Sequence, residues 1–214
     1  MVPLVSGTPY DFDVDPTGLK VVAYGQWSSM DYYDLATNQT TSTIFTEMKR
    51  GLSIDADGTV ITSSFYTENV KRWDPYDGSE TAILSVVGQA CNSIYGSTVA
   101  RSGNIYLLVR CTPSGWDNPI WTVKKWTAAT EALTTVAELT PGSYYQYDNP
   151  RDYYLTYRIS SIAVDDSEEA VYLPSRSSIW RAAPGSGVFT EIITGLNEPS
   201  DVAVRTAAGP FLDY

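Results

Sequence analysis

The sequence predicts an all-β protein, a five-bladed β-propeller formed by one domain over residues 1–214. Three observations lead to this fold. Short segments with alternating or β-branched residues are separated along the whole chain by turns rich in Asp and Gly. A unit of four such segments recurs at blade-like spacing. No apolar stripe with helical spacing extends over ten residues.

The clearest copy of the repeat lies between residues 52 and 87. Leu52–Ser63 reads as a strand, an Asp-Ala-Asp-Gly turn and a second strand. Val70–Gly78 adds a third strand with another Asp/Gly turn, and Thr81–Val87 adds a fourth. Four strands in about forty residues are typical of one propeller blade.

The first half of this unit recurs at four other places. If Val14, Ile54, Val99, Val164 and Val204 are equivalent, the spacings are 40, 45, 65 and 40 residues. Three of these spacings are typical of propeller repeats, and the third blade carries a long insertion. The expected blades lie near residues 8–48, 49–88, 89–142, 157–195 and 196–214 plus 1–7. The expected inner strands lie near residues 11–15, 52–56, 97–101, 160–165 and 201–205.

The last blade has too few residues for four strands of its own. Residues 1–11 match residues 193–201 in form, because both read as outer strand, Gly, Pro, Asp and inner strand. We therefore expect residues 2–6 to form the outer strand of the last blade and close the ring, since an open edge invites pairing with other chains. One strand of the last blade is still missing, and there are three alternatives. The blade has only three strands, the chain is a piece of a larger polypeptide, or a neighbouring chain donates the strand. The third case predicts self-association through this blade.

The segment Gly195–Val204 and the Asp-x-x-Gly inner turns resemble NHL-type, YVTN-type and gluconolactonase-like propeller repeats. The resemblance covers most of the chain and implies a propeller fold. Families with such repeats include surface-layer modules, protein-binding platforms and metal-dependent lactonases.

Composition excludes several functions. The chain has no histidine, which rules out Ser-His-Asp and Cys-His catalysis and His-ligated zinc. The net charge of −11 disfavours nucleic acid as a partner. No apolar run approaches 18 residues, so membrane insertion is not expected.

The turn face of the predicted propeller carries the inner hairpin turns. Asp55 and Asp57 in one of these turns are acidic, but a full Asp-x-Asp-x-Asp-Gly calcium loop with a distal Glu is absent. We therefore interpret them as turn residues and predict neither a metal nor another cofactor. On the third strands we expect Trp73, Trp126 and Trp180 to pack between blades. The basic pairs Lys71–Arg72 and Lys124–Lys125 on these strands are expected on solvated faces.

The opposite face, called the loop face here, carries the loops from outer to inner strands and from second to third strands. It receives residues 143–158, which hold six Tyr in 16 residues. Rigid amphipathic rings beside Asp, Asn and Arg are typical of a recognition surface, although a Tyr-rich loop can also simply cap the fold. The residues predicted to bind a ligand are Tyr10, Asp11, Trp27, Arg50, Tyr66, Trp116, Asp117, Tyr147, Tyr154, Arg158 and Asp201.

The two cysteines, Cys91 and Cys111, both fall on the loop-face side of the third blade. We predict that they form a disulfide, with two buried thiols as the alternative. A disulfide, together with the Asn-x-Thr site at Asn38–Thr40, favours an extracellular or surface location.

Three classes of function remain. The first is a non-catalytic recognition or adhesion module that binds a glycan or a protein through the loop face. The second is a carboxylate-dependent glycoside hydrolase or lactonase-like enzyme, for which Asp11, Asp13 and Asp201 lie near inner strands. The third is a structural subunit that assembles through an incomplete blade.

Overall fold

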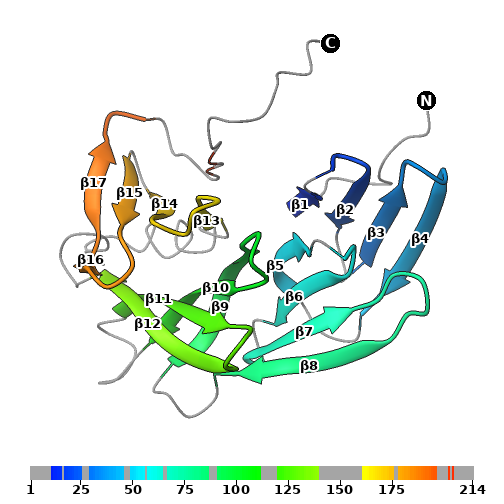
Figure 1. The fold of residues 1–214 in the computed structure, drawn as a ribbon, viewed down its shortest axis with the longest axis horizontal. Coiled ribbons are helices and arrows are strands. Elements are labelled where there is room, and N and C mark those ends of the chain that lie inside the picture. The colour runs from blue at the N-terminus through cyan, green and yellow to red at the C-terminus, as the bar shows by residue number, and fades with distance from the viewer. Residues whose placement is uncertain are drawn as a thin grey trace, which may run out of the picture.

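The computed structural model describes most of the repeat. The described residues are 11–15, 17–25, 29–45, 49–55, 57–64, 67–86, 91–111, 120–139, 161–175 and 178–196, together with Val202 and Val204. Their regular structure consists of β-strands, which form four sheets with antiparallel pairing throughout except for one short parallel pair. The sheets follow one another as blades along an arc, with each inner strand on the concave side (Figure 1).

Blades 1 and 2 have the strand order expected from the repeat, from the inner to the outer edge. Blade 1 consists of β1 (Asp11–Val14), β2 (Lys20–Tyr24), β3 (Ser29–Asp34) and β4 (Gln39–Ile44). Blade 2 consists of β5 (Lys49–Ile54), β6 (Val60–Ser64), β7 (Asn69–Trp73) and β8 (Glu80–Ser85). Each blade is a meander in which consecutive strands pair, because short turns join them.

Blades 3 and 4 have the same arrangement, except that one short strand from the segment of blade 4 joins the sheet of blade 3. Blade 3 consists of β9 (Cys91–Val99), β10 (Ile105–Cys111), β11 (Ile120–Thr127) and β12 (Ala132–Leu139). Blade 4 consists of β13 (Ala163–Val164), β14 (Val171–Ser175), β15 (Ser178–Ala182) and β17 (Thr190–Ile193). The short β16 (Gly187–Val188) leaves blade 4 and pairs in parallel with β12 at the outer edge of blade 3.

The core lies between neighbouring blades. Each junction between blades has its own apolar cluster. The cluster between blades 1 and 2 contains Trp73, and the cluster between blades 3 and 4 contains Trp121. The cluster between blades 2 and 3 contains Ile61 of blade 2 and Leu107 of blade 3. The predicted packing of Trp73, Trp126 and Trp180 between blades is confirmed, since each belongs to or packs against one of these clusters. Burial of large apolar side chains between sheets is the main term that holds blades together.

The described residues form four blades, and the predicted fifth blade is not confirmed. The fifth blade was expected on residues 196–214 and 1–7. This expectation falls almost entirely outside the described residues, and the described Val202 and Val204 are not in a strand. Residues 196–214 alone are also much shorter than the about 40–45 residues that a four-stranded blade needs. Closure by residues 2–6 lies outside the described residues and stays a prediction.

Candidate functional site

Most predicted ligand-binding residues lie outside the described part of the chain. These are Tyr10, Trp27, Tyr66, Trp116, Asp117, Tyr147, Tyr154, Arg158 and Asp201. Two others are described at the level of backbone: Asp11 begins β1, and Arg50 lies near the start of β5. Strands β1 and β5 are the inner strands of neighbouring blades. Because both positions lie at or near the start of their strands, the fold places them on the same face of the propeller, the loop face.

The turn face, by contrast, is described in all four blades, and its inner turns share one geometry. The first turn residue donates its N–H to the carbonyl of a residue at or just before the next strand, and the fourth residue donates to the carbonyl of the first. The fourth residue has a positive φ: +72° at Gly18, +87° at Gly58, +83° at Gly103 and +57° at Glu168. Glycine is the usual residue in this left-handed conformation, so Glu168 departs from the pattern at a cost in backbone energy.

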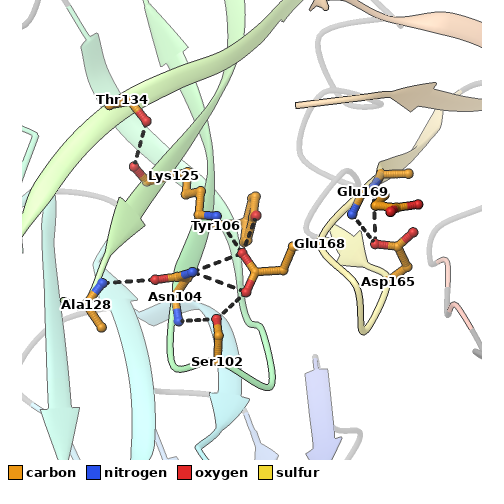
Figure 2. Close-up of polar contacts among 10 residues, drawn as sticks. Ser102, Asn104, Tyr106, Lys125, Ala128, Thr134, Asp165, Glu168 and Glu169 are labelled. Atoms are coloured by element: carbon orange, nitrogen blue, oxygen red, sulfur yellow. Dashed lines mark hydrogen bonds and ion pairs between the residues drawn. The ribbon is translucent and has the colours of Figure 1, made fainter. Parts of the chain in front are cut away.

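Glu168 compensates for this conformation with contacts to the neighbouring blade. Its carboxylate points away from its own turn, towards the inner turn and strands of blade 3 (Figure 2). Lys125 Nζ lies 2.6 Å from Glu168 Oε2, and Tyr106 Oη donates to the same oxygen at 2.7 Å. Asn104 Nδ2 lies 3.1 and 3.0 Å from the two carboxylate oxygens, and Ser102 Oγ also donates to Oε1.

The partners of Glu168 are themselves held in place. Asn104 Oδ1 accepts a hydrogen bond from the Ala128 N–H at 3.0 Å, and Asn104 N–H donates to Ser102 Oγ at 3.2 Å. Lys125 Nζ lies 5.3 Å from the centroid of the Tyr106 ring, within the range of a cation–π contact. We call the carboxylate and its four side-chain partners the Glu168 network.

Electrostatics indicate that the carboxylate of this network is ionised. Burial by itself raises the pKa of Glu168, but hydrogen bonds from Lys125, Ser102, Asn104 and Tyr106 outweigh it and hold the pKa at about 2. Burial, followed by the hydrogen bond to Glu168, raises the pKa of Tyr106, which therefore stays a neutral donor. A carboxylate with such a low pKa cannot act as a general acid near neutral pH. The arrangement is suited to joining blades 3 and 4.

Other polar contacts join the remaining blades. Ile54 N–H and Ser53 Oγ of blade 2 donate to Asp13 Oδ2 of blade 1 at 2.9 and 3.0 Å, and Val99 N–H of blade 3 donates to Ser53 Oγ at 3.1 Å. Val202 N–H donates to Ser161 Oγ at 3.3 Å in the same manner. Asp13, one of the carboxylates considered for catalysis, therefore accepts hydrogen bonds from one backbone N–H and one side-chain hydroxyl of the next inner strand.

The expectation that the two basic pairs lie on solvated faces fails for Lys124, whereas Lys71 and Arg72 are partly exposed and pair with carboxylates. Arg72 lies 2.9 Å from Asp55, Lys71 lies 3.1 Å from Glu80, and Lys125 belongs to the Glu168 network. Lys124 is buried, and burial lowers its pKa. Carboxylates on adjacent turns and strands attract these cations, and sequence periodicity alone does not reveal such pairs.

Sequence reasoning also missed Glu68, which lies between β6 and β7 on the loop face. It has a positive φ of 55°, and its carbonyl accepts the N–H of the buried Val86 at 3.0 Å. Burial raises the pKa of its carboxyl group. Backbone strain and a raised carboxyl pKa together are features of functional sites.

The backbone register places Cys91 directly opposite Cys111 in the β9–β10 pair. Opposite residues in antiparallel strands have Cα atoms about 4.5–5.5 Å apart, within the range that a disulfide needs. The Cys91–Cys111 disulfide stays a prediction and should stabilise the fold by about 3 kcal/mol in the chain-entropy model. Thiol titration of the denatured, non-reduced protein is expected to find no free thiol, and two reactive thiols would refute the bond.

No cluster of three or more His, Cys, Asp or Glu side chains is arranged to hold a metal ion within the described ranges. No helix in the same part of the chain is long and apolar enough to span a membrane.

Comparison with known proteins supports the fold. No family model matches the sequence, and no curated protein is similar to it in sequence. Solved structures are similar in three dimensions. A luciferin-regenerating enzyme has a TM-score of 0.57 at 10% identity, and its alignment covers 89% of this chain and 61% of that one. A virginiamycin B lyase from Staphylococcus aureus has a TM-score of 0.55 at 10% identity, covering 90% of this chain and 57% of the lyase.

A third structure, the β-propeller domain of Cps50 (Swd1) from Myceliophteria thermophila, has a TM-score of 0.51 at 12% identity, with 90% of this chain and 58% of the domain covered. The chain thus spans about three fifths of the length of each of these structures. At such low identity the comparisons show the fold alone, and they confirm the predicted β-propeller.

Proposed function

We propose that this β-propeller is a non-catalytic recognition module of a secreted or surface protein, which binds a glycan or a protein through its loop face. The observation that carries the proposal is a difference between the two faces. On the turn face, described carboxylates are committed to structure: Glu168 joins blades, while Asp15 and Asp57 accept hydrogen bonds within their own turns. Hydrogen bonds lower the pKa of both Asp15 and Asp57 despite their partial burial.

The loop face has the composition that recognition needs. Residues 143–158, which the repeat predicts on this face, combine six Tyr with Asp, Asn and Arg. Tyr and Trp supply large contact areas with few rotatable bonds, and polar neighbours give direction to the contact. Long connections in compact folds tend to carry function. The predicted disulfide would stabilise blade 3 at this same end and supports export from the cell.

An enzyme is the second candidate, and Glu68 favours it. A carboxyl group on the loop face with a raised pKa has the property required of a general acid in glycoside hydrolysis. Such a mechanism needs a second carboxylate at a suitable distance, for which Asp11 and Asp201 stay candidates on the same face.

Glycan-array binding and turnover, measured on the same preparation, separate these functions. We expect the protein to bind a defined glycan or protein ligand, with no release of sugar from bound oligosaccharides and no opening of lactones. The Glu68→Gln variant should then bind as the parent does, and Glu138→Gln on the outer strand of blade 3 is a control of equal charge change. Turnover that is lost in Glu68→Gln but retained in Glu138→Gln would establish the enzyme instead.

A further inference from the structure

The outer strands of the four blades differ in how their edges are protected. In blades 2, 3 and 4 the outer strand carries one residue more than the strand it pairs with, and the register shifts at that point. The extra residues occupy equivalent places in the three blades: Ile83 in β8, Val136 in β12 and Ile192 in β17. Such β-bulges twist an edge strand and hinder its pairing with another chain.

The bulged strands have further protection. Strand β8 begins with Glu80, which pairs with Lys71, and β17 has only four residues, including Glu191. The edge of β12 contains Glu138 and is partly covered by β16, which pairs with residues 137–138. Charges, short strands and covering segments are the usual means by which proteins prevent edge-to-edge association.

Strand β4 in blade 1 has none of these features among the described residues. Its six residues, Gln-Thr-Thr-Ser-Thr-Ile, pair one for one with β3 without a register shift. It contains no charge, no proline and no glycine, and among the described strands it pairs with β3 alone. Ile44 at its end is 78% exposed. A regular, uncharged, β-branched edge is a template for the addition of another strand.

We propose that β4 pairs antiparallel with β4 of a second copy of this chain, forming a two-fold dimer whose sheets continue across the interface. The sequence of β4 is suited to self-pairing. When the two strands are centred on Thr41, this residue faces Thr41 of the second copy, and Thr40 faces Ser42. Cross-strand Thr–Thr and Thr–Ser pairs are favourable by about 0.2–1 kcal/mol each, and no like charges meet.

Charge elsewhere on the molecule sets the strength of this dimer. Two chains with a net charge of −11 repel each other, whereas the paired strand itself is neutral. We therefore expect a weak dimer that is favoured by high protein concentration and by added salt, because salt screens the repulsion.

Sedimentation velocity of the purified full chain over a wide concentration range, at low and high salt, tests the proposal. The Thr40→Lys/Ser42→Lys variant places lysines opposite each other twice in the proposed register and should be monomeric. Thr81→Lys/Ala82→Lys on β8 adds the same charge to exposed positions of another outer strand and should dimerise as the parent does. Mixing the lysine variant with Thr40→Glu/Ser42→Glu should restore a dimer containing one copy of each. Circular dichroism verifies that all variants are folded.

A parent chain that stays monomeric under every condition would overturn the proposal. So would a dimer that persists in Thr40→Lys/Ser42→Lys, or one that is lost equally in the β8 control. Absence of a mixed dimer between the lysine and glutamate variants would contradict the antiparallel register.

Discussion

Replacing Gly51 by alanine is expected to destabilise the protein by about 3 kcal/mol, because strain and overpacking add at this position. Gly51 is the extra residue of a bulge in β5 and has a φ of +72°. A Cβ atom there would lie 2.4 Å from the backbone nitrogen of Ser97 and 2.8 Å from Ser63 Oγ. Because Ser97 belongs to β9, the clash would push apart the inner strands of blades 2 and 3. Urea unfolding of the variant measures the loss.

Gly78→Ala is the matched control for this prediction. Gly78 has a φ of +77°, but a Cβ atom there would meet nothing within 4 Å. This variant should lose only the backbone term, about 1 kcal/mol. Equal losses in Gly51→Ala and Gly78→Ala would show that the close contact between blades 2 and 3 has no energetic weight.

Replacing Glu168 by alanine is expected to cost about 3 kcal/mol, since it leaves the partly buried Lys125 and the donors of Asn104 and Tyr106 without their acceptor. Glu168→Gly removes the same carboxylate but restores the residue that the other three turns use, so it should be about 1 kcal/mol more stable than Glu168→Ala. Unfolding curves of the two variants and the parent separate the inter-blade contacts from the backbone strain. A Glu168→Gly variant as stable as the parent would refute a stabilising role for the network.

The network also predicts a pH dependence. The pKa of Glu168 is about 2 in the folded protein, against an ordinary value of 4.5. The ionised carboxylate therefore contributes its full stability above about pH 4.5, and this contribution is lost as the pH falls towards 2. Glu168→Gln should remove this part of the acid sensitivity. Melting temperatures of the parent and Glu168→Gln between neutral and acidic pH should converge as the pH falls; a constant difference would contradict the assignment.

The repeat made the fold predictable. Equivalent residues such as Val14, Ile54 and Val99 mark inner strands because their spacing reflects one blade after another, and β1, β5 and β9 fall where this spacing places them. The number of blades was less predictable. The spacing that ends at Val204 identifies a fifth copy of the inner-strand motif, but a blade also needs partner strands, which one half-motif does not supply.

The inter-blade contacts were missed because they join residues far apart in sequence. Lys125 and Glu168 meet only when blades 3 and 4 pack together. One signal was nevertheless present: aligning the inner turns places Glu168 where Gly18, Gly58 and Gly103 stand in the other copies. A non-glycine residue in a position that favours a positive φ indicates that its side chain has compensating contacts. The regular edge of β4 left no such signal, because a bulge is a property of strand pairing.

The central claim is that recognition belongs to the loop face, while the turn face holds the blades together. Affinity of an identified ligand for single variants on each face tests it most directly. Tyr147→Ala, Tyr154→Ala and Trp116→Ala on the loop face are each expected to weaken binding by about 1 kcal/mol or more, as aromatic contacts at interfaces do. The turn-face change Asp77→Ala removes an exposed carboxylate that accepts the Ser79 N–H within its own turn, and it should leave the affinity unchanged. Binding that survives all three loop-face changes and is lost in Asp77→Ala would contradict the account.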